Sequence, residues 1–467
     1  MQAGVNQIEG KNSFSLDFGK LGKAVLCALC PLLLGLWRPF SMTWRQGVVF
    51  GGLVMVIIWW STGWVKKIPS SLMLLAIFLV VGRAPVETVF SFPLSDNFLL
   101  IIFCYLFSQG IENSHIAEKT IGPLLFRFAG TPLRMVIAVI LSFCVTIYVI
   151  PQPLARLIII ANIVRAHLKK TDAPASAQSV LLFSVFLFYV IVNMAALDAD
   201  IILNSSSVGF ASLSMTNGEW MEYMLIPTIF YTIAVLALFL FVFHKQLRGV
   251  TLKPREQEQK EERQFTTHEK WVLVVVLGTM VLWMTSGLHG INPTYITLAG
   301  TVLLFAMKVL RMKDFSAIDV NTMVFLTAAF CIGGVLTSTG IADIIFSRIG
   351  RMFPGQFGPL YILVMILITM CMHLILGSNT TTLSVVLPAL ISICGGVMSG
   401  PEILMIAYIS VTAHFLLPFH AVSLMIGAGN GYFPSSYASK FGLPMMALII
   451  AGIFGIYIPY WTMMGLV

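Results

Sequence analysis

Charged side chains are scarce in this sequence. Asp, Glu, Lys and Arg make up 10% of its 467 residues, whereas apolar residues make up 58%. Because a water-soluble domain carries roughly 25% charged residues, this composition excludes a soluble enzyme, a disordered chain and a nucleic-acid-binding module. The apolar runs are about 18–20 residues long and do not alternate as barrel strands do. The predicted class is therefore an all-α polytopic membrane protein.

Signatures of ATP binding, metalloprotease chemistry and serine hydrolysis are also missing. The chain contains no Walker motif, no H-E-x-x-H and no G-x-S-x-G, and no polar segment is long enough for a catalytic domain. Its seven cysteines lie in apolar stretches without metal-ligand spacing. We expect no enzymatic activity, no disulfides and no cofactor, apart from Na⁺ as a candidate coupling ion.

The formal net charge of +8 does not indicate a nucleic-acid partner. Basic residues lie in loops and at helix ends, for example Lys66–Lys67 and Lys169–Lys170, where positive charge sets the orientation of membrane helices. We expect a multi-pass protein of the plasma (inner) membrane whose contacts are the lipid bilayer and a small solute.

Polar stretches divide the chain into parts. Residues 1–20 lack a signal-peptide pattern and are predicted to form a cytoplasmic N-terminus, followed by a first transmembrane helix within 21–45. Residues 244–270 form a long charged stretch and are predicted to be a cytoplasmic linker. The linker separates a first half, 46–243, from a second half, 271–467.

The two halves resemble each other. Trp59 and Trp283 are 224 residues apart, and so are Pro69 and Pro293. Each half also has two short apolar runs separated by a non-helical tract, YVIPQPLAR in the first and ILGSNTTT in the second. Duplicated halves with interrupted helices are typical of secondary transporters. The pattern predicts an inverted-topology repeat of about 11 transmembrane helices plus two re-entrant helical hairpins, at 133–168 and 358–399.

The tract Ser378-Asn379-Thr380 is the sharpest motif in the sequence. Its hydroxyl and amide oxygens are suitable ligands for Na⁺, while its donors and the backbone N–H groups of the following helix start are suitable for a carboxylate. We therefore predict that Ser378, Asn379 and Thr380 bind the substrate and are candidate Na⁺ ligands. The alternative is an ordinary helix N-cap, because Ser and Asn are common there.

The corresponding tract in the first half is Pro151-Gln152-Pro153. Two prolines break the helix and leave Gln152 able to donate or accept hydrogen bonds, and Arg156 follows in the next helix. A cation in a membrane segment usually has a partner or a function. We predict that Gln152, Pro153 and Arg156 contribute to substrate binding, the alternative for Arg156 being a snorkelling or topology-setting residue.

Carboxylates and one histidine are candidates for proton coupling. Asp198 and Asp200 follow the first hairpin and its next span, and His420 lies in a span that Pro418 is expected to unwind. His420 and Ser423 are also predicted to line the substrate site. The alternatives are a hydrated loop for the two aspartates and a structural role for His420.

The chain resembles the divalent anion–sodium symporter family. That family carries two Ser-Asn-Thr motifs, one at each hairpin tip, and the second is matched by Ser378-Asn379-Thr380 with Leu387-Pro388 after it. The resemblance covers the chain from about residue 21 to its end. It is closest to the branch of bacterial citrate/tartrate and plastid dicarboxylate exchangers, in which the first motif reads Pro-Ser-Asn-Thr-Ala-Arg. Here Gln152-Pro153-Leu154 replaces Ser-Asn-Thr, so the first motif is degenerate.

This resemblance implies a secondary active transporter of a small di- or tricarboxylate. It implies a homodimer with a scaffold part and a moving transport part, an elevator-type mechanism, and either symport with Na⁺ or H⁺ or anion exchange. Two alternatives stay open: a non-transporting membrane sensor or scaffold on the same fold, and a transporter of an inorganic oxyanion.

Overall fold

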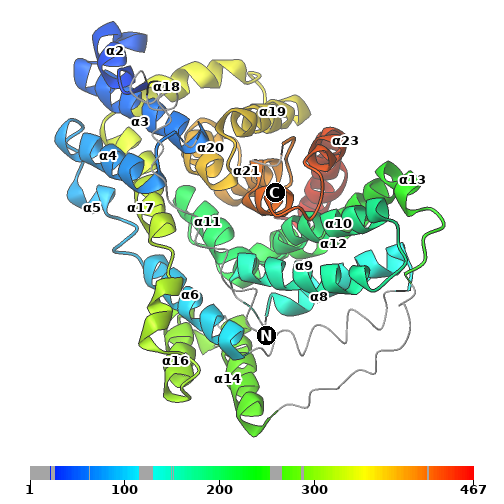
Figure 1. Cartoon of the computed structure of the whole chain (residues 1–467). Helices are drawn as coiled ribbons and strands as arrows, with labels where there is room; N and C mark the ends of the chain where they lie inside the picture. The colour runs from blue at the N-terminus through cyan, green and yellow to red at the C-terminus, as the bar shows by residue number, and fades with distance from the viewer. Residues whose placement is uncertain are drawn as a thin grey trace.

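A computed structural model of the chain confirms the predicted fold class (Figure 1). It describes residues 22, 27–62, 64–114, 130–148, 150, 152–252, 266–285, 289–417 and 420–466, and within these residues the regular elements are helices. The predicted N-terminal segment, 1–20, lies outside them, as do Pro151 and Pro418.

Several helices have the length and apolar composition needed to cross a membrane. Five such spans occur among the described residues: α10 (Ala175–Asn193), α12 (Asn217–Val242), α17 (Val320–Ser338), α19 (Pro359–Leu376) and the continuous stretch Ser436–Met463, which contains α23 (Ser436–Gly452) and α24 (Ile458–Met463). Shorter apolar helices accompany them: α3 (Trp44–Thr62), α4 (Lys67–Val80), α6 (Asp96–Ser114), α8 (Pro132–Thr146), α16 (Pro293–Ala306), α20 (Asn379–Cys394) and α21 (Gly400–Thr412). These apolar helices identify a polytopic membrane protein.

The predicted first transmembrane helix, within 21–45, is only partly described. Its described part contains α2 (Cys30–Trp37), which ends at Arg38 in the left-handed conformation. Pro39 then begins a short 3₁₀ turn before α3. The break is explained by the chain geometry, because Pro39 cannot continue the hydrogen-bond ladder of α2.

Polar caps define where several of the other helices begin. Thr216 and Glu219 form a capping box at the start of α12, and Thr266 and Glu269 form one at the start of α14 (Thr267–Met284). Each box satisfies backbone N–H groups that the first helical turn leaves without partners. α14 therefore begins at Thr267, within the last four residues of the predicted linker, 244–270.

Both predicted breaks in the hairpin regions are present. In the first, α8 ends at Thr146 and α9 (Pro153–Lys169) begins at Pro153. In the second, α19 is followed by Gly377, whose φ of 64° is left-handed, and α20 begins two residues later. The two helices of each pair pack against each other. Each pair therefore forms a helical hairpin whose tip is the break.

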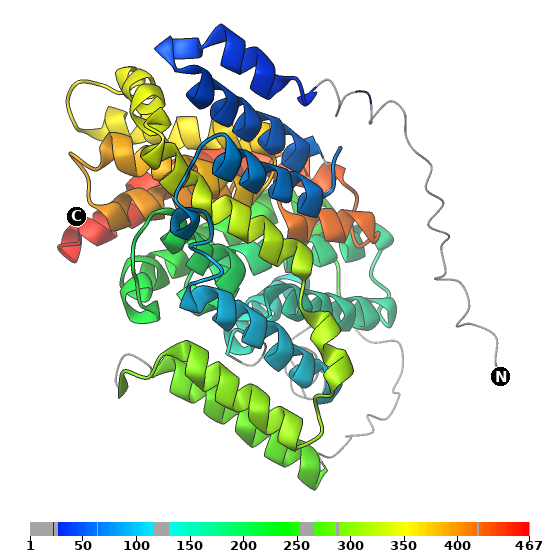
Figure 2. The ribbon, with the colours of Figure 1, turned by 90° about the vertical axis from the view of Figure 1, so that its left-hand side faces the viewer.

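Helices from the two halves of the chain pack reciprocally. α4 of the first half packs on α17 of the second, and α16 of the second half packs on α6 of the first. The pair α14 and α16 lies together at one end of the molecule (Figure 2). The hairpins and α10, α12, α21 and α23 gather on the other side of α6 and α17 (Figure 1).

Two helices of the second group are interrupted in the middle of the molecule. After α10 the chain passes through a 3₁₀ turn, Leu197–Asp200, and a π turn, Ile201–Ser205, into α11 (Ser206–Phe210). After α21 it reaches α22 (Val422–Gly429) through a non-helical loop. The interruption expected near Pro418 is therefore found on both sides of the undescribed pair 418–419. These interruptions bring irregular backbone to the level of the hairpin tips.

Candidate functional site

The two hairpin tips line one cavity. Its volume is about 360 Å³, and its wall includes Gln152 and Pro153 from the first tip together with Ser378, Asn379 and Thr380 from the second. These segments are more than 220 residues apart in the sequence. The volume is at the lower end of the range for small-molecule sites, so the cavity suits a small solute.

The second tip is open towards this cavity. Ser378 occupies the N-cap position of α20, yet its side chain caps no backbone N–H. The carboxamide Oδ1 of Asn379 is buried and makes no hydrogen bond of normal geometry among the described residues, although the His373 imidazole interacts with the Asn379 side chain. The tip therefore offers uncapped backbone donors for an anion and a spare oxygen for a cation. Ser378 is thus the N-cap residue of α20 by position, as the alternative has it, but its side chain makes no capping hydrogen bond.

The first tip is closed by comparison. The Oε1 of Gln152 accepts from the backbone N–H of Ala155, and its own backbone N–H donates to Ser108 Oγ at 2.8 Å. Pro153, at the first position of α9, has no N–H to offer. This tip keeps the Gln152 amide nitrogen at the cavity but presents few backbone donors.

Arg156 lies behind the first tip and is fully buried, with 0% of its surface exposed. Its guanidinium donates to the carbonyl of Ile150 at 3.0 Å, to Asn193 Oδ1 at 2.8 Å and to the carbonyl of Ala199. It is not among the residues that line the cavity. Arg156 thus braces the tip against the break that follows α10, and it neither snorkels nor faces the solute directly.

The two candidate aspartates are placed differently. Asp200 lines the cavity, and its Oδ1 accepts from the backbone N–H of Leu203 at 3.1 Å. Asp198 does not line the cavity, and its backbone N–H approaches Asn217 Oδ1 at 3.4 Å. Both side chains are half-buried. Only Asp200 is in a position to exchange a proton with the cavity.

Ser423 and His420 are also placed differently with respect to the cavity. Ser423 lines the cavity at the start of α22, a helix whose N-cap, Ala421, has no capping side chain. His420 is 1% exposed and is not a lining residue; its Nδ1 accepts from the backbone N–H groups of Leu416 at 3.0 Å and Leu417 at 3.3 Å. These bonds hold the loop between α21 and α22 and favour the structural reading of His420.

Two further histidines surround His420, a grouping that the sequence did not indicate. His373 Nε2 lies 3.2 Å from the carbonyl oxygen of His420, and His373 Nδ1 lies 3.0 Å from His414 Nδ1. His373 belongs to the arm of the second hairpin and the other two to the loop after α21. The cluster therefore ties this hairpin to the neighbouring interrupted helix, as Arg156 does for the first hairpin.

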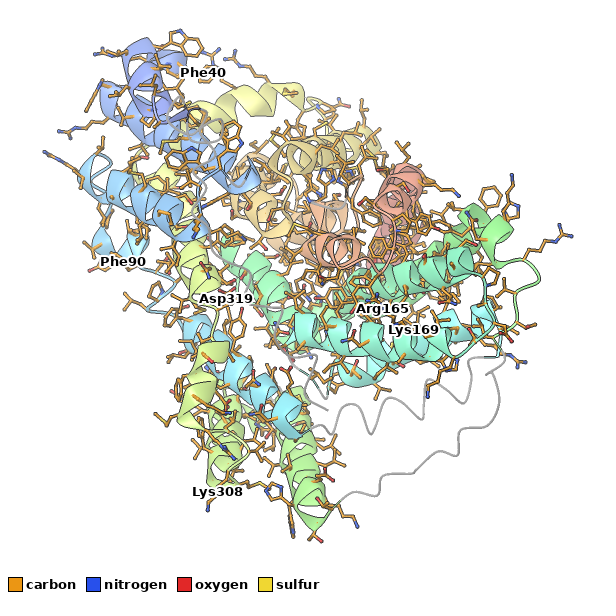
Figure 3. All side chains as sticks on the ribbon, in the orientation of Figure 1. Phe40, Phe90, Arg165, Lys169, Lys308 and Asp319 are labelled. Carbon is orange, nitrogen blue, oxygen red and sulfur yellow. The ribbon has the colours of Figure 1, made fainter. Side chains whose placement is uncertain are left out.

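The cavity wall also carries residues that the sequence analysis missed. Lys67 begins α4, Tyr105 lies in α6, and Asp319 caps α17; all three line the cavity. Figure 3 labels Asp319 at the start of α17. Sequence reasoning took Lys67 as a topology-setting flank, because no local pattern shows that α4 begins beside the two tips.

The two tips differ in how well they fit Na⁺. Ser378, Asn379 and Thr380 provide hard oxygen ligands. The Oδ1 of Asn379 makes no hydrogen bond of normal geometry, so its lone pairs are available to a cation. At the first tip, Oε1 of Gln152 and the carbonyls of Ile150 and Ala199 already accept from protein donors. Within the described residues no group of three or more His, Cys, Asp or Glu side chains could hold a metal ion. Only the second tip is suited to a monovalent cation.

Comparison with known proteins agrees with this architecture. The family model described as the sodium:sulfate symporter transmembrane region matches residues 22–467. A relative, the uncharacterized transporter MJ0672 of Methanocaldococcus jannaschii, is 24% identical over 201 residues, which is 41% of this chain and 44% of that protein. The aligned region thus spans less than half of the relative. Because the family model covers nearly the whole chain, the protein belongs to the sodium:sulfate symporter family.

Proposed function

We propose that the protein is a secondary active transporter of a small organic anion, a di- or tricarboxylate, which binds between the two hairpin tips. The observation that carries this proposal is the convergence of the helix starts of α9, α20 and α22 on one cavity. Each helix N-terminus is equivalent to roughly half a positive charge. Those of α20 and α22 have no capping side chain, so an anion can replace the missing caps.

One carboxylate binds at the second tip in this proposal. The backbone N–H groups at the start of α20 and the side chains of Ser378, Asn379 and Thr380 provide donors there, and Ser423 adds a hydroxyl from α22. Gln152 provides an amide donor from the first tip. Arg156 does not contact the substrate in this proposal. Its hydrogen bonds hold the tip that carries Gln152 and Pro153, and its positive charge lies behind the residues that line the cavity.

Coupling has two candidate sites within the cavity. Na⁺ binding at the second tip is supported by the spare oxygen of Asn379 and by the family to which the chain belongs. Proton coupling through Asp200 is supported by its place in the wall, whereas Asp198 and His420 lack that support. Anion exchange requires neither ion.

The same proposal includes an elevator-type movement of a transport part, in a homodimer in the plasma membrane. The reciprocal packing of α4 on α17 and α16 on α6 supports an inverted repeat, because a twofold axis exchanges equivalent helices of the two halves. In this arrangement α4, α6, α16 and α17 belong to the scaffold. The hairpins with α10, α12 and α21 to α23 carry the substrate.

Uptake into liposomes that contain the purified protein tests the function. We expect uptake of succinate or citrate that saturates with concentration, and melting of the detergent-purified protein at a higher temperature when the same anion is present. Repeating both measurements with and without Na⁺ and across pH identifies the coupling ion. Stabilisation by an anion without flux would instead identify a sensor or scaffold.

A second candidate cargo is an inorganic oxyanion. The description of the matching family names sulfate, and uncapped helix N-termini bind sulfate as readily as carboxylate. Competition decides between the two: sulfate that inhibits uptake while succinate and citrate do not would favour the oxyanion.

A further inference from the structure

Lys67 provides a positively charged side chain to the cavity wall. Among the described residues that line the cavity, it is the one Lys or Arg. Arg156 is buried behind the first tip and does not line the cavity. The neighbours of Lys67 in the cavity wall include Tyr105 of α6 and Phe325 of α17. The Lys67 side chain is exposed, so its charge is accessible to a solute in the cavity.

The ammonium group of Lys67 is positioned without being neutralised. Its Nζ lies 4.8 Å from the centroid of the Phe325 ring, a cation–π contact that orients the charge and leaves its N–H donors available. The nearest carboxylate on this wall, Asp319, already accepts from Asn321 at 3.0 Å and from Thr322 at 2.5 Å. Asp319 is hydrogen-bonded within the start of its own helix, and its negative charge also attracts Lys67.

Lys67 and the two tips line the same cavity, whose volume is about 360 Å³. The uncapped helix starts of α20 and α22 and the ammonium group of Lys67 are therefore two separate sources of attraction for anionic groups in one space. A molecule with two anionic groups can bind to both at once.

We propose that Lys67 binds the second anionic group of the substrate, while the tips bind the first. This inference rests on the proposed function and deepens it, since it assigns a two-headed anion such as a dicarboxylate rather than a compact oxyanion. Lys67 belongs to the scaffold-side wall, so this contact forms when the substrate enters from the open side and breaks when the transport part moves. Lys67 is consequently a determinant of affinity and specificity.

The test compares Lys67→Met with Lys66→Met in the full-length protein. Methionine keeps an apolar stem over Phe325 and removes the charge. Lys66 is the neighbouring lysine, is exposed, makes no side-chain cap and is not a lining residue. The probes are succinate and butyrate, which have the same chain length and differ by one carboxylate. Half-saturating concentrations come from thermal melting, and KM and kcat for succinate come from liposome uptake.

In Lys67→Met we expect the half-saturating concentration and KM for succinate to rise about tenfold to a hundredfold, as the loss of a charge-assisted hydrogen bond predicts. Butyrate binding should change less than about threefold, since butyrate has no second carboxylate, and kcat should be retained. Lys67→Arg should restore most of the succinate preference, and Lys66→Met should behave as wild type in every assay.

Several results would overturn the inference. Equal losses for succinate and butyrate would mean that Lys67 acts on fold or general attraction, and identical behaviour of Lys67→Met and Lys66→Met would remove it from the site. Wild-type protein that binds sulfate but not succinate would contradict a two-headed substrate while leaving anion transport intact. Wild-type protein that responds to none of these anions would instead reject the proposed function, and the inference with it.

Discussion

The two hairpin tips share one architecture but differ in whether their polar groups are hydrogen-bonded within the protein. At the first tip, Gln152 caps α9 and Arg156 ties the tip to the break after α10. At the second, Ser378 leaves α20 uncapped and Asn379 keeps a buried oxygen that makes no hydrogen bond of normal geometry. The first tip has its polar groups satisfied internally, whereas the second leaves them for a solute or ion. Of the two tips, the second should therefore contribute more to binding, and the first more to stability.

Of the substitutions considered, Arg156→Met should have the largest effect, because it removes the hydrogen bonds that stabilise the first tip. Methionine leaves Asn193 and the carbonyls of Ile150 and Ala199 without the donor they now share. A buried acceptor left without its donor costs about 1–3 kcal/mol, so we expect a melting temperature several degrees lower and greatly reduced uptake. Melting of the ligand-free protein in detergent measures the first effect.

Arg156→Lys serves as the control for this prediction. Lysine retains the charge but lacks the planar fork that reaches three acceptors at once, so it should recover only part of the stability. If Arg156→Met instead melted like wild type and lost only anion affinity, the guanidinium would contact the solute, and the brace at the first tip would be refuted.

How much the sequence revealed differs between the two tips. Both breaks were predictable, because Pro153 and Gly377 interrupt apolar runs at matching places in the two halves. The roles of the polar side chains were not. Arg156 binds Asn193 and Ala199, which lie 37 and 43 residues further along the chain. The direction in which a helical side chain points is set by packing between helices, which periodicity within one helix does not reveal.

The contribution of Lys67 to the cavity wall was beyond sequence reasoning for a related reason. Lys67 has the appearance of a residue at a membrane edge, since it follows another lysine and precedes an apolar helix. It reaches the cavity because α4 packs on α17, whose first residues line the same space. The three buried histidines likewise come from segments about 40 residues apart and meet only in the fold.

Asn379→Leu should show whether the second tip contributes to ligand binding rather than to stability. Leucine fills a similar volume but removes the amide donor and the lone Oδ1. We expect anion affinity to fall about tenfold or more, as for the loss of a hydrogen bond to a charged group, with little change in the melting temperature of the ligand-free protein. Succinate-dependent thermal shifts, measured with and without Na⁺, report both effects.

Asn379→Asp provides the matched variant for this position. Its carboxylate repels an anion but strengthens a cation site, so Na⁺ dependence should persist while succinate binding is lost. A melting temperature that falls as far as in Arg156→Met would contradict the assignment of Asn379 to ligand binding.

Gln152→Ala and Ser378→Ala should separate stability from binding at equivalent positions. Gln152 caps α9 through its side chain, and removal of a cap costs about 0.5–2 kcal/mol. Ser378 caps nothing through its side chain, so its replacement should leave the melting temperature nearly unchanged and weaken anion binding. Melting curves of both variants, each with and without succinate, test this. Equal destabilisation by the two substitutions would show that the tips are alike.

Gly377→Ala should have the smallest effect and should isolate the backbone of the second tip. Gly377 ends α19 with a φ of 64° and satisfies a helix carbonyl by donating to His373 O at 2.9 Å. A residue with a Cβ pays about 1 kcal/mol in this conformation, which either lowers stability or shifts the turn that presents Ser378. Asparagine tolerates the left-handed region better, so Gly377→Asn should retain more anion affinity than Gly377→Ala. The same order in half-saturating succinate concentration would show that the geometry of this turn, as well as its side chains, prepares the open tip for its ligand.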